Sequence, residues 1–147
     1  MACQDDQLSA GLKSLINGAI HGVQSLWDEN LSTEERGFFL VDAKNAFNDI
    51  NRFGMLWTVQ HLWLSGDCFF FNWYRHWSLL VLRNVNGTAS ILNSREGVTQ
   101  GGPLAMIVYG IGILPLIKNL ERAIPDVTHP WYTDDAGALG TFARLET

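Results

Sequence analysis

The fold is decided by residues 37–42, GFFLVD, a nearly continuous apolar run that ends in a carboxylate. Such a run, without alternating polar residues, is typical of a strand buried on both faces of a sheet. The apolar spacing then changes to that of a helix. We therefore predict a buried strand whose last residue, Asp42, lies at the end of the sheet.

A second acidic site follows near the C-terminal end of the sequence. Residues 127–133 and 136–142 predict two strands about a tight turn that contains Asp134 and Asp135. Carboxylates gathered at the end of a sheet repel one another, and a divalent cation such as Mg²⁺ removes that cost. With Asp42, these residues indicate metal-assisted phosphoryl transfer. Ordinary turn chemistry explains Asp in such places equally well, and this alternative stays open.

The remaining pattern predicts helices and one further hairpin. Helical apolar spacing covers residues 8–27, 53–64, 69–77 and 103–117. Pro115 predicts a kink or an early end in the last of these helices. Asn86-Gly87 predicts a hairpin between residues 79–82 and 89–92. The fold class is therefore α+β, a small antiparallel sheet with helices packed on one face.

Composition excludes several classes of protein. The chain has 147 residues, 47% of them hydrophobic, a net charge of −5 and two Cys. This predicts one domain and excludes intrinsic disorder, a disulfide framework and a zinc site of recognisable spacing. The longest apolar run is too short to cross a membrane, and the N-terminus does not resemble a signal peptide. We expect an intracellular protein, nuclear or cytoplasmic and not secreted.

The central part of the chain combines basic and aromatic residues. Residues 36–95 carry six Lys and Arg against three acidic residues, and these basic residues include Arg52, Arg75, Arg83 and Arg95. This local excess favours a nucleic-acid module, whereas the net charge of the whole chain argues against one. The aromatic residues between 57 and 77 are expected in the core of two helices, with base stacking or an exposed interface as alternatives.

Three segments resemble the palm motifs of reverse transcriptases. Residues 39–47, FLVDAKNAF, are similar to the first motif, an Asp with an aromatic residue after four further positions. Residues 97–105, GVTQGGPLA, resemble the second, a Gln-Gly loop leading into a helix that starts with Pro. Residues 132–135, YTDD, resemble the third. The similarity is greatest to the non-LTR (LINE-like) retrotransposon group, in which a helix resembling residues 7–23 precedes the palm.

The resemblance implies RNA-directed DNA polymerisation by two-metal catalysis, in which a primer 3′-hydroxyl attacks a dNTP. Two Mg²⁺ ions are the implied cofactors, with Mn²⁺ as an alternative. Asp42 and Asp134 would be the main metal ligands and Asp135 a third acidic contributor.

The same resemblance assigns residues to the substrates. Phe47 would occupy the space that a ribose 2′-hydroxyl needs, and so would select deoxynucleotides. Gln100 and Gly101 would lie against the incoming nucleotide and the template, and Tyr132 would pack beneath the primer end. A core Phe, an ordinary glycine loop and a core Tyr are the structural alternatives for these positions.

The implied organisation is a single domain, a partial fingers helix over about 1–35 followed by a palm over about 36–147. A thumb and most of the fingers of a parent polyprotein are expected to be missing, so weak or no activity is expected of the fragment alone. The implied partners are an RNA or DNA template with a primer and a dNTP, without a membrane. The alternatives are a catalytically dead relic that binds nucleic acid or another protein, and a different Mg²⁺ nucleotidyltransferase or nuclease on a similar palm.

Overall fold

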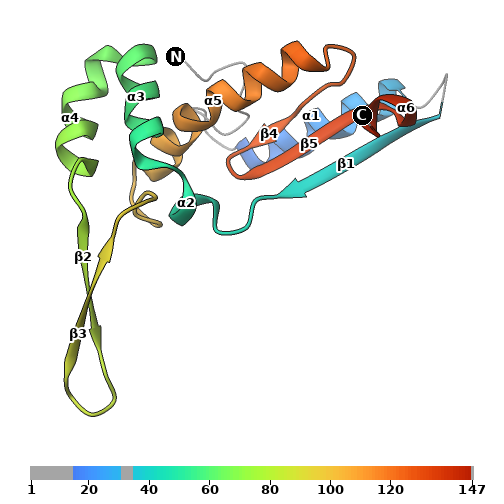
Figure 1. The fold of residues 1–147 in the computed structure, drawn as a ribbon. Helices are drawn as coiled ribbons and strands as arrows, with labels where there is room; N and C mark the ends of the chain where they lie inside the picture. Colours follow the sequence, from blue (N-terminus) through green and yellow to red (C-terminus); the bar gives the residue numbers. More distant parts are fainter. Residues whose placement is uncertain (1–14, 31–34, 147) are drawn as a thin grey trace. The chain divides into compact units, whose positions relative to one another are not determined.

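The computed structural model describes residues 15–30 and 35–146 (Figure 1). In chain order the elements are α1 (Leu15–Asn30), β1 (Arg36–Asp42), α2 (Ala46–Asp49), α3 (Arg52–Leu62), α4 (Leu64–Tyr74), β2 (Ser78–Arg83), β3 (Ala89–Ser94), α5 (Ala105–Ala123), β4 (Trp131–Tyr132), β5 (Asp135–Thr141) and α6 (Phe142–Leu145). The predicted α+β class with small antiparallel sheets is confirmed. The beginning of the first predicted helix lies outside the described residues.

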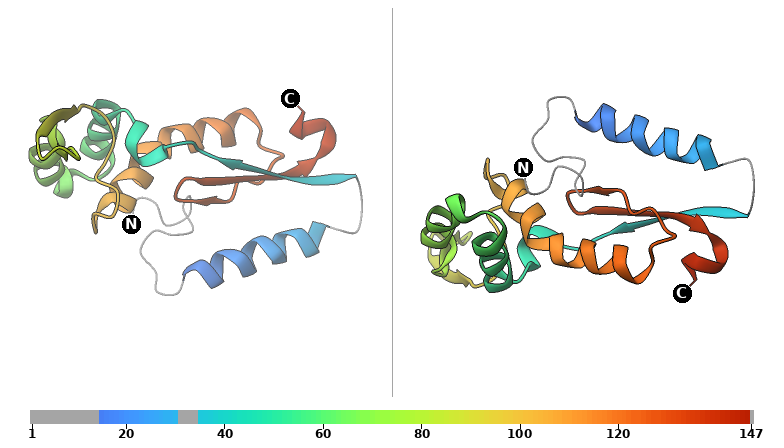
Figure 2. Two further views of the ribbon diagram at one scale, coloured as in Figure 1. Left: turned by 90° about the horizontal axis from the view of Figure 1, so that it is seen from below. Right: turned by 90° about the horizontal axis from the view of Figure 1, so that it is seen from above.

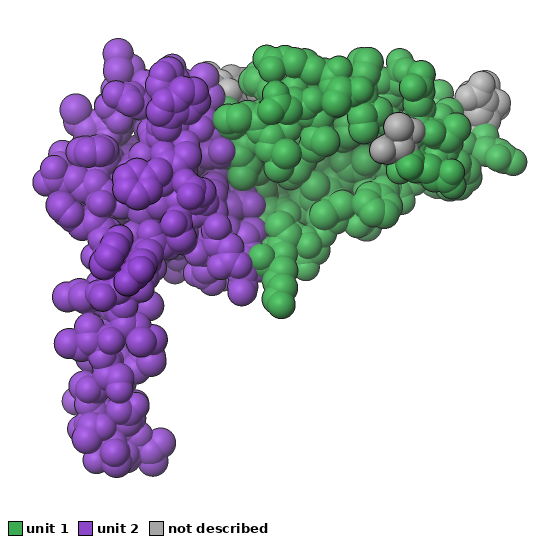
Figure 3. Space-filling view, viewed as in Figure 1, with its two compact units in different colours: residues 1–44, 113–147 green, residues 45–112 purple. Residues whose placement is uncertain are grey.

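The chain divides into two compact units, coloured separately in Figure 3. Unit 1 comprises residues 1–44 and 113–147, and unit 2 comprises residues 45–112, so that one division falls within α5. The expected organisation into a fingers helix and a palm stays a prediction.

Unit 1 is built around an antiparallel sheet with the strand order β1-β5-β4 in the described residues. The register places Arg36 opposite Thr141 at one end of β1 and Asp42 opposite Asp135 at the other. Helix α1 lies along one face of this sheet and the second half of α5 along the other (Figure 2). The helices of unit 1 therefore cover both faces, where the sequence predicted one.

Strand β1 forms where it was predicted, but the prediction that it is buried on both faces is wrong. Phe39, Leu40 and Val41 are 59%, 72% and 47% exposed. Among the described strands β1 pairs only with β5, so it is an edge strand. A continuous apolar run indicates a strand, but it does not say how many neighbours that strand has within one chain.

Unit 2 has a small core between α3, α4 and the first half of α5. On α3 the buried apolar side chains are Met55, Leu56 and Val59. The helical apolar spacing of residues 53–64 placed Phe53 and Trp57 on one face with Leu56, but they are 75% and 60% exposed. Both sides of α3 carry large apolar residues, so hydrophobicity alone could not select the inner one.

The prediction of a core role for the aromatic stretch is wrong for most of its members. Phe70 and Tyr74 are buried in unit 2, but most of the other rings are exposed. The exposed rings of this stretch are Trp57, Phe69, Phe71, Trp73 and Trp77. The alternative of an exposed interface describes them better.

Strands β2 and β3 form the predicted hairpin, which extends from the rest of unit 2 and is exposed over nearly its whole length (Figure 1). The N–H of Asn84 donates to the carbonyl of Thr88 at 2.8 Å, which leaves a three-residue loop, 85–87. Gly87 has a φ of +81° in this loop. Asn86-Gly87 thus marked the hairpin correctly, with one more loop residue than a two-residue turn has.

Helix α5 buries the face that the sequence predicted, including Val108, Ile111, Leu114 and Ile117. The sequence predicted a kink or an early end at Pro115. The early end is wrong, because the helix continues to Ala123, and the kink stays a prediction. Pro115 lies on the exposed side of α5, where its ring does not interrupt the buried face.

Candidate active site

The register of unit 1 brings two of the three predicted carboxylates together. Asp42, the last residue of β1, is the direct partner of Asp135, the first residue of β5. Directly opposite residues of an antiparallel pair have side chains on the same face and Cα atoms about 4.5–5.5 Å apart. Both residues are exposed. Two like charges therefore lie side by side at the end of the sheet.

The hairpin that follows differs in detail from the prediction. Its turn consists of Thr133 and Asp134, and Asp135 already belongs to β5. Thr133 is buried and has a φ of +56°, a conformation that β-branched residues rarely adopt. Positive φ at the first of two turn residues is typical of the type II′ hairpin turn, in which Gly usually stands at this position. Asp134, expected as a main metal ligand, lies half-buried in this turn, and Asp135 is the residue opposite Asp42.

Tyr132 lies on the same face of the sheet as the carboxylate pair, because it is the partner of Asp135 on β4. On this face unit 1 has a pocket of about 400 Å³. The sheet contributes Phe38, Leu40, Tyr132 and Asp135 to its lining, and α1 contributes mainly apolar side chains. The pocket is therefore apolar with a carboxylate at one end.

Three acidic, His or Cys side chains do not converge on one point anywhere in residues 15–30 and 35–146. The pair Asp42 and Asp135 nevertheless fits a single Mg²⁺, since this ion is commonly held by one or two protein carboxylates and completes its shell with water and substrate phosphates. The cross-strand repulsion of the two carboxylates is the feature that such an ion would relieve.

The residues assigned to substrate binding lie, apart from Tyr132, in unit 2. Phe47 belongs to the short helix α2, and its ring packs against that of Tyr109 with 4.8 Å between centroids. The N–H of Val98 donates to the carbonyl of Phe47 at 2.7 Å, and the N–H of Gly97 donates to the carbonyl of Ile50 at 2.9 Å. The segment that leads into the Gln-Gly loop is thus fixed to α2.

Gln100 and Gly101 form the middle of an exposed turn. The N–H of Gly102 donates to the carbonyl of Thr99 at 2.9 Å, and Gly101 has a φ of +83°. Positive φ at the third position is typical of a type II turn. No atom lies within 4 Å of the place where a Cβ of Gly101 would stand. The backbone of this turn is therefore open to close approach by a ligand.

Sequence reasoning missed the role of Arg52, which it counted among the basic residues of a nucleic-acid surface. Arg52 is 6% exposed, and its guanidinium donates to the carbonyls of His76, Ser94, Glu96 and Gly97 at 2.7–3.3 Å. It connects the start of α3 to the end of α4, the base of the hairpin and the loop before α5. Its acceptors are backbone carbonyls, so no sequence signal marked this role; the sequence marked only the adjacent Asn51, which caps α3 by accepting from the N–H of Gly54.

No protein-family model and no curated protein matches the sequence. Solved structures do match. Telomerase from Candida albicans in complex with a TWJ fragment of telomeric RNA has a TM-score of 0.66 and 11% identity, over 92% of this chain and 27% of that one. Apo telomerase from Candida tropicalis, truncated from its C-terminal domain, has a TM-score of 0.68 and 13% identity, over 99% of this chain and 33% of that one.

The chain spans about a third or less of those telomerase chains. At this level of identity the likeness concerns the fold. None of the helices in the described segments is long and apolar enough to cross a lipid bilayer. The fold of this chain is reverse transcriptase-like.

Proposed function

We propose that the chain is the palm region of a retroelement reverse transcriptase, of the non-LTR type that its motifs resemble. The reaction is transfer of a nucleotide from a dNTP to a primer 3′-hydroxyl, directed by a template. The observation that carries the proposal is the pairing of Asp42 with Asp135 at the end of the sheet. We expect the complete protein in the nucleus or the cytoplasm.

In this proposal the pair Asp42 and Asp135 holds Mg²⁺, with Asp134 of the adjoining turn as the further acidic residue that the motif resemblance implies, and Mn²⁺ can replace Mg²⁺. Bound Mg²⁺ would stabilise charge on the attacking and the leaving oxygen of an in-line displacement. By holding the ion, the carboxylates would fix the positions of the primer 3′-hydroxyl and of the triphosphate relative to each other. A charge pair that destabilises the sheet without a cation supports the assignment, since function is a common reason for such a pair to persist.

In this proposal the residues assigned to substrate binding contribute through where their side chains and backbone lie, and not through chemical catalysis. Phe47 would exclude the 2′-hydroxyl of a ribonucleotide, and the packing of its ring against that of Tyr109 supports this assignment because it fixes the position of the ring. The open turn of Gln100 and Gly101 lets its backbone approach the base pair being formed, because glycine leaves room there. Tyr132 supports the primer end beside the carboxylates.

The test is primer extension on poly(rA)/oligo(dT) with Mg²⁺. We expect low incorporation by the chain itself, and none by Asp42→Asn or by the double variant Asp134→Asn/Asp135→Asn. Glu121→Gln is a matched control, an exposed acidic residue of α5 in the same unit. It should leave incorporation unchanged.

Thermal unfolding with and without Mg²⁺ or Mn²⁺ is the second measurement. A metal-dependent rise of Tm that Asp135→Asn removes supports the carboxylate site even if the chain alone does not extend primers. Absence of both extension and metal-dependent stabilisation contradicts the proposal and favours the inactive relic.

A further inference from the structure

We propose that Arg75, Trp77 and Arg95 together bind single-stranded nucleic acid, and we call them the arginine–tryptophan surface. They lie in unit 2, where α4 meets the hairpin: Arg75 caps the end of α4, Trp77 directly precedes β2 and Arg95 directly follows β3. The candidate carboxylates take no part in it. The inference therefore goes beyond nucleotidyl transfer.

The three side chains of this surface line one small hollow of unit 2. The guanidinium of Arg95 lies 4.2 Å from the centroid of the Trp77 ring, and that of Arg75 lies 5.6 Å from the centroid of Phe71. A guanidinium stacked on a ring keeps its N–H groups free to point outward in its own plane. Trp77 is still 56% exposed, so the indole also offers surface to a ligand.

The charge of this surface is not neutralised within its own unit. No acidic residue lines the hollow. In the described part of the chain neither Arg75 nor Arg95 lies within ion-pair distance of a carboxylate. The nearest acidic residue in sequence, Glu96, accepts instead from the backbone N–H of Arg52 at 2.8 Å. In a chain whose net charge is −5, this is a local site for an anion.

Positive charge beside an exposed aromatic ring indicates which class of anionic ligand fits this surface. Single-stranded nucleic acid presents phosphates and the π-faces of bases in alternation, and proteins bind it with basic grooves and stacking aromatic side chains. Arginine adds a cation–π contribution on the same rings. An acidic protein segment would match the charge but would offer no flat partner to the indole. The structure therefore points to single-stranded nucleic acid as the ligand.

The experiment is a fluorescence-anisotropy titration of labelled oligo(dT) and oligo(rU) with the whole chain. EDTA is present, so that the carboxylates contribute no bound metal. Trp77→Leu should weaken binding about tenfold, the effect expected for loss of one base–aromatic stack. Arg95→Gln should weaken binding and lower the slope of log K against log salt by about 0.7. Arg95→Lys, which keeps the charge but not the planar group, should fall between Arg95→Gln and the unmodified chain.

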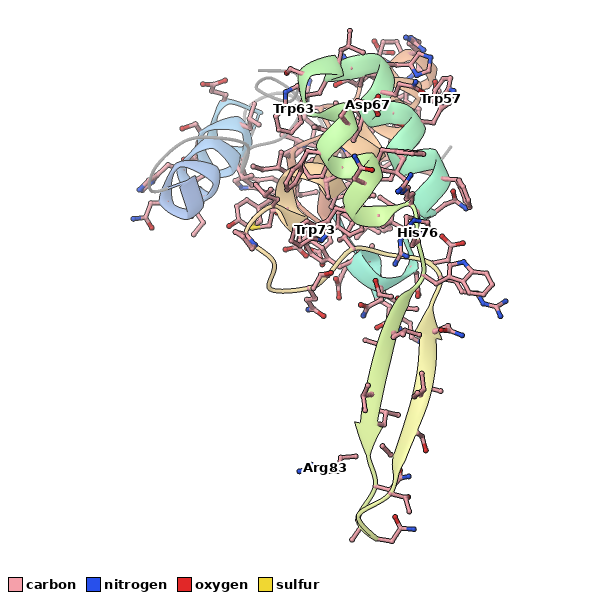
Figure 4. The ribbon with its side chains drawn as sticks, turned by 90° about the vertical axis from the view of Figure 1, so that its left-hand side faces the viewer. Trp57, Trp63, Asp67, Trp73, His76 and Arg83 are labelled. Atoms are coloured by element: carbon pink, nitrogen blue, oxygen red, sulfur yellow. The ribbon has the colours of Figure 1, made fainter. Side chains whose placement is uncertain are left out.

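Two matched controls use residues away from the hollow. Trp73 is an exposed tryptophan of α4, and Arg83 lies at the far end of the hairpin (Figure 4). Trp73→Leu and Arg83→Gln should each change binding by less than about twofold, if the arginine–tryptophan surface is the site. Circular dichroism of every variant verifies that it is folded.

Three results would overturn the inference. The first is that folded Trp77→Leu and Arg95→Gln bind the oligonucleotides as tightly as the unmodified chain does. The second is that the two control variants weaken binding as much as Trp77→Leu and Arg95→Gln do. The third is that polyglutamate competes for the chain as strongly as unlabelled oligonucleotide does. Glu121→Gln, which is outside both sites, should bind oligonucleotides like the unmodified chain. The titration is done in EDTA and does not measure incorporation, so failure of the carboxylate site in primer extension is distinguishable from failure of this surface.

Discussion

The backbone N–H of Val98 donates to the carbonyl of Phe47, at 2.7 Å, and so joins the segment after Asp42 to the segment that leads to Gln100. Gly97 makes this contact feasible. It has a φ of +77°, and a Cβ at this position would overlap the backbone of Asn48. Only glycine fits here without displacement of α2.

Gly97→Ala is therefore expected to destabilise unit 2 by about 2–4 kcal/mol, from backbone strain and steric overlap together. Gly101→Ala is the matched control, because Gly101 also has positive φ but has open space around the Cβ position. Gly101→Ala should lower the free energy of unfolding by the backbone strain alone, about 1–2 kcal/mol. Urea unfolding followed by tryptophan fluorescence measures both. Equal losses would show that the contact with Asn48 is unimportant.

Arg52→Met should destabilise unit 2 by about 3–5 kcal/mol, because four carbonyls would lose a buried charged donor. Arg52→Lys should recover part of this loss, since one ammonium cannot reach all of the same acceptors. Arg83→Met, at an exposed site, should stay within about 0.5 kcal/mol of the unmodified chain. Urea unfolding gives the three values. A loss for Arg52→Met no larger than that for Arg83→Met would refute the structural role.

Asp42→Asn should raise the stability of unit 1 by up to about 1 kcal/mol in EDTA at low salt, because it removes a like-charge pair across two strands. High salt should reduce this gain, since both side chains are exposed and screened. Added Mg²⁺ should stabilise the unmodified chain by mass action and leave Asp42→Asn unchanged. Thermal unfolding measures these shifts, with Glu121→Gln as the control. A variant less stable in EDTA than the unmodified chain would contradict the repulsion.

The hairpin exposes apolar side chains on both of its faces. Val81 and Ile91, which are direct partners, are 67% and 65% exposed. Val81→Thr/Ile91→Thr keeps β-branched residues in the strands and removes apolar surface. We expect weaker self-association in light scattering and a change in unfolding free energy below about 0.5 kcal/mol. Scattering equal to that of the unmodified chain would place the association elsewhere.

The sequence predicted what depends on local pattern. The strand before Asp42, the hairpin at Asn86-Gly87 and the buried face of α5 are found as expected, since periodicity and turn residues determine them. It did not predict correctly which side of α3 is buried, because Phe53, on the predicted side, and Met55, on the buried side, are both large and apolar. Which face of a helix is buried depends on the helices and strands that pack against it, and these belong to distant parts of the sequence.

The candidate site was predictable to a similar extent. The motifs and strand ends predicted that Asp42 lies close to both Asp134 and Asp135. The register brings Asp42 opposite Asp135, but a cluster of three carboxylates is not found among the described residues. The burial of Arg52 was not, because its acceptors are backbone carbonyls, which carry no signature in sequence. Hydrogen bonds from a side chain to backbone carbonyls can be identified only from a structure, because the carbonyls belong to segments that are far apart in the sequence.

Strand β1 has a consequence for handling the protein. Among the described strands nothing pairs with its edge away from β5, and Phe39 and Leu40, which point to opposite faces of the strand, are both exposed. An exposed apolar edge strand of this kind is a site at which a strand of another chain can add. Where this edge is left uncovered, concentrated samples are therefore expected to associate strand to strand.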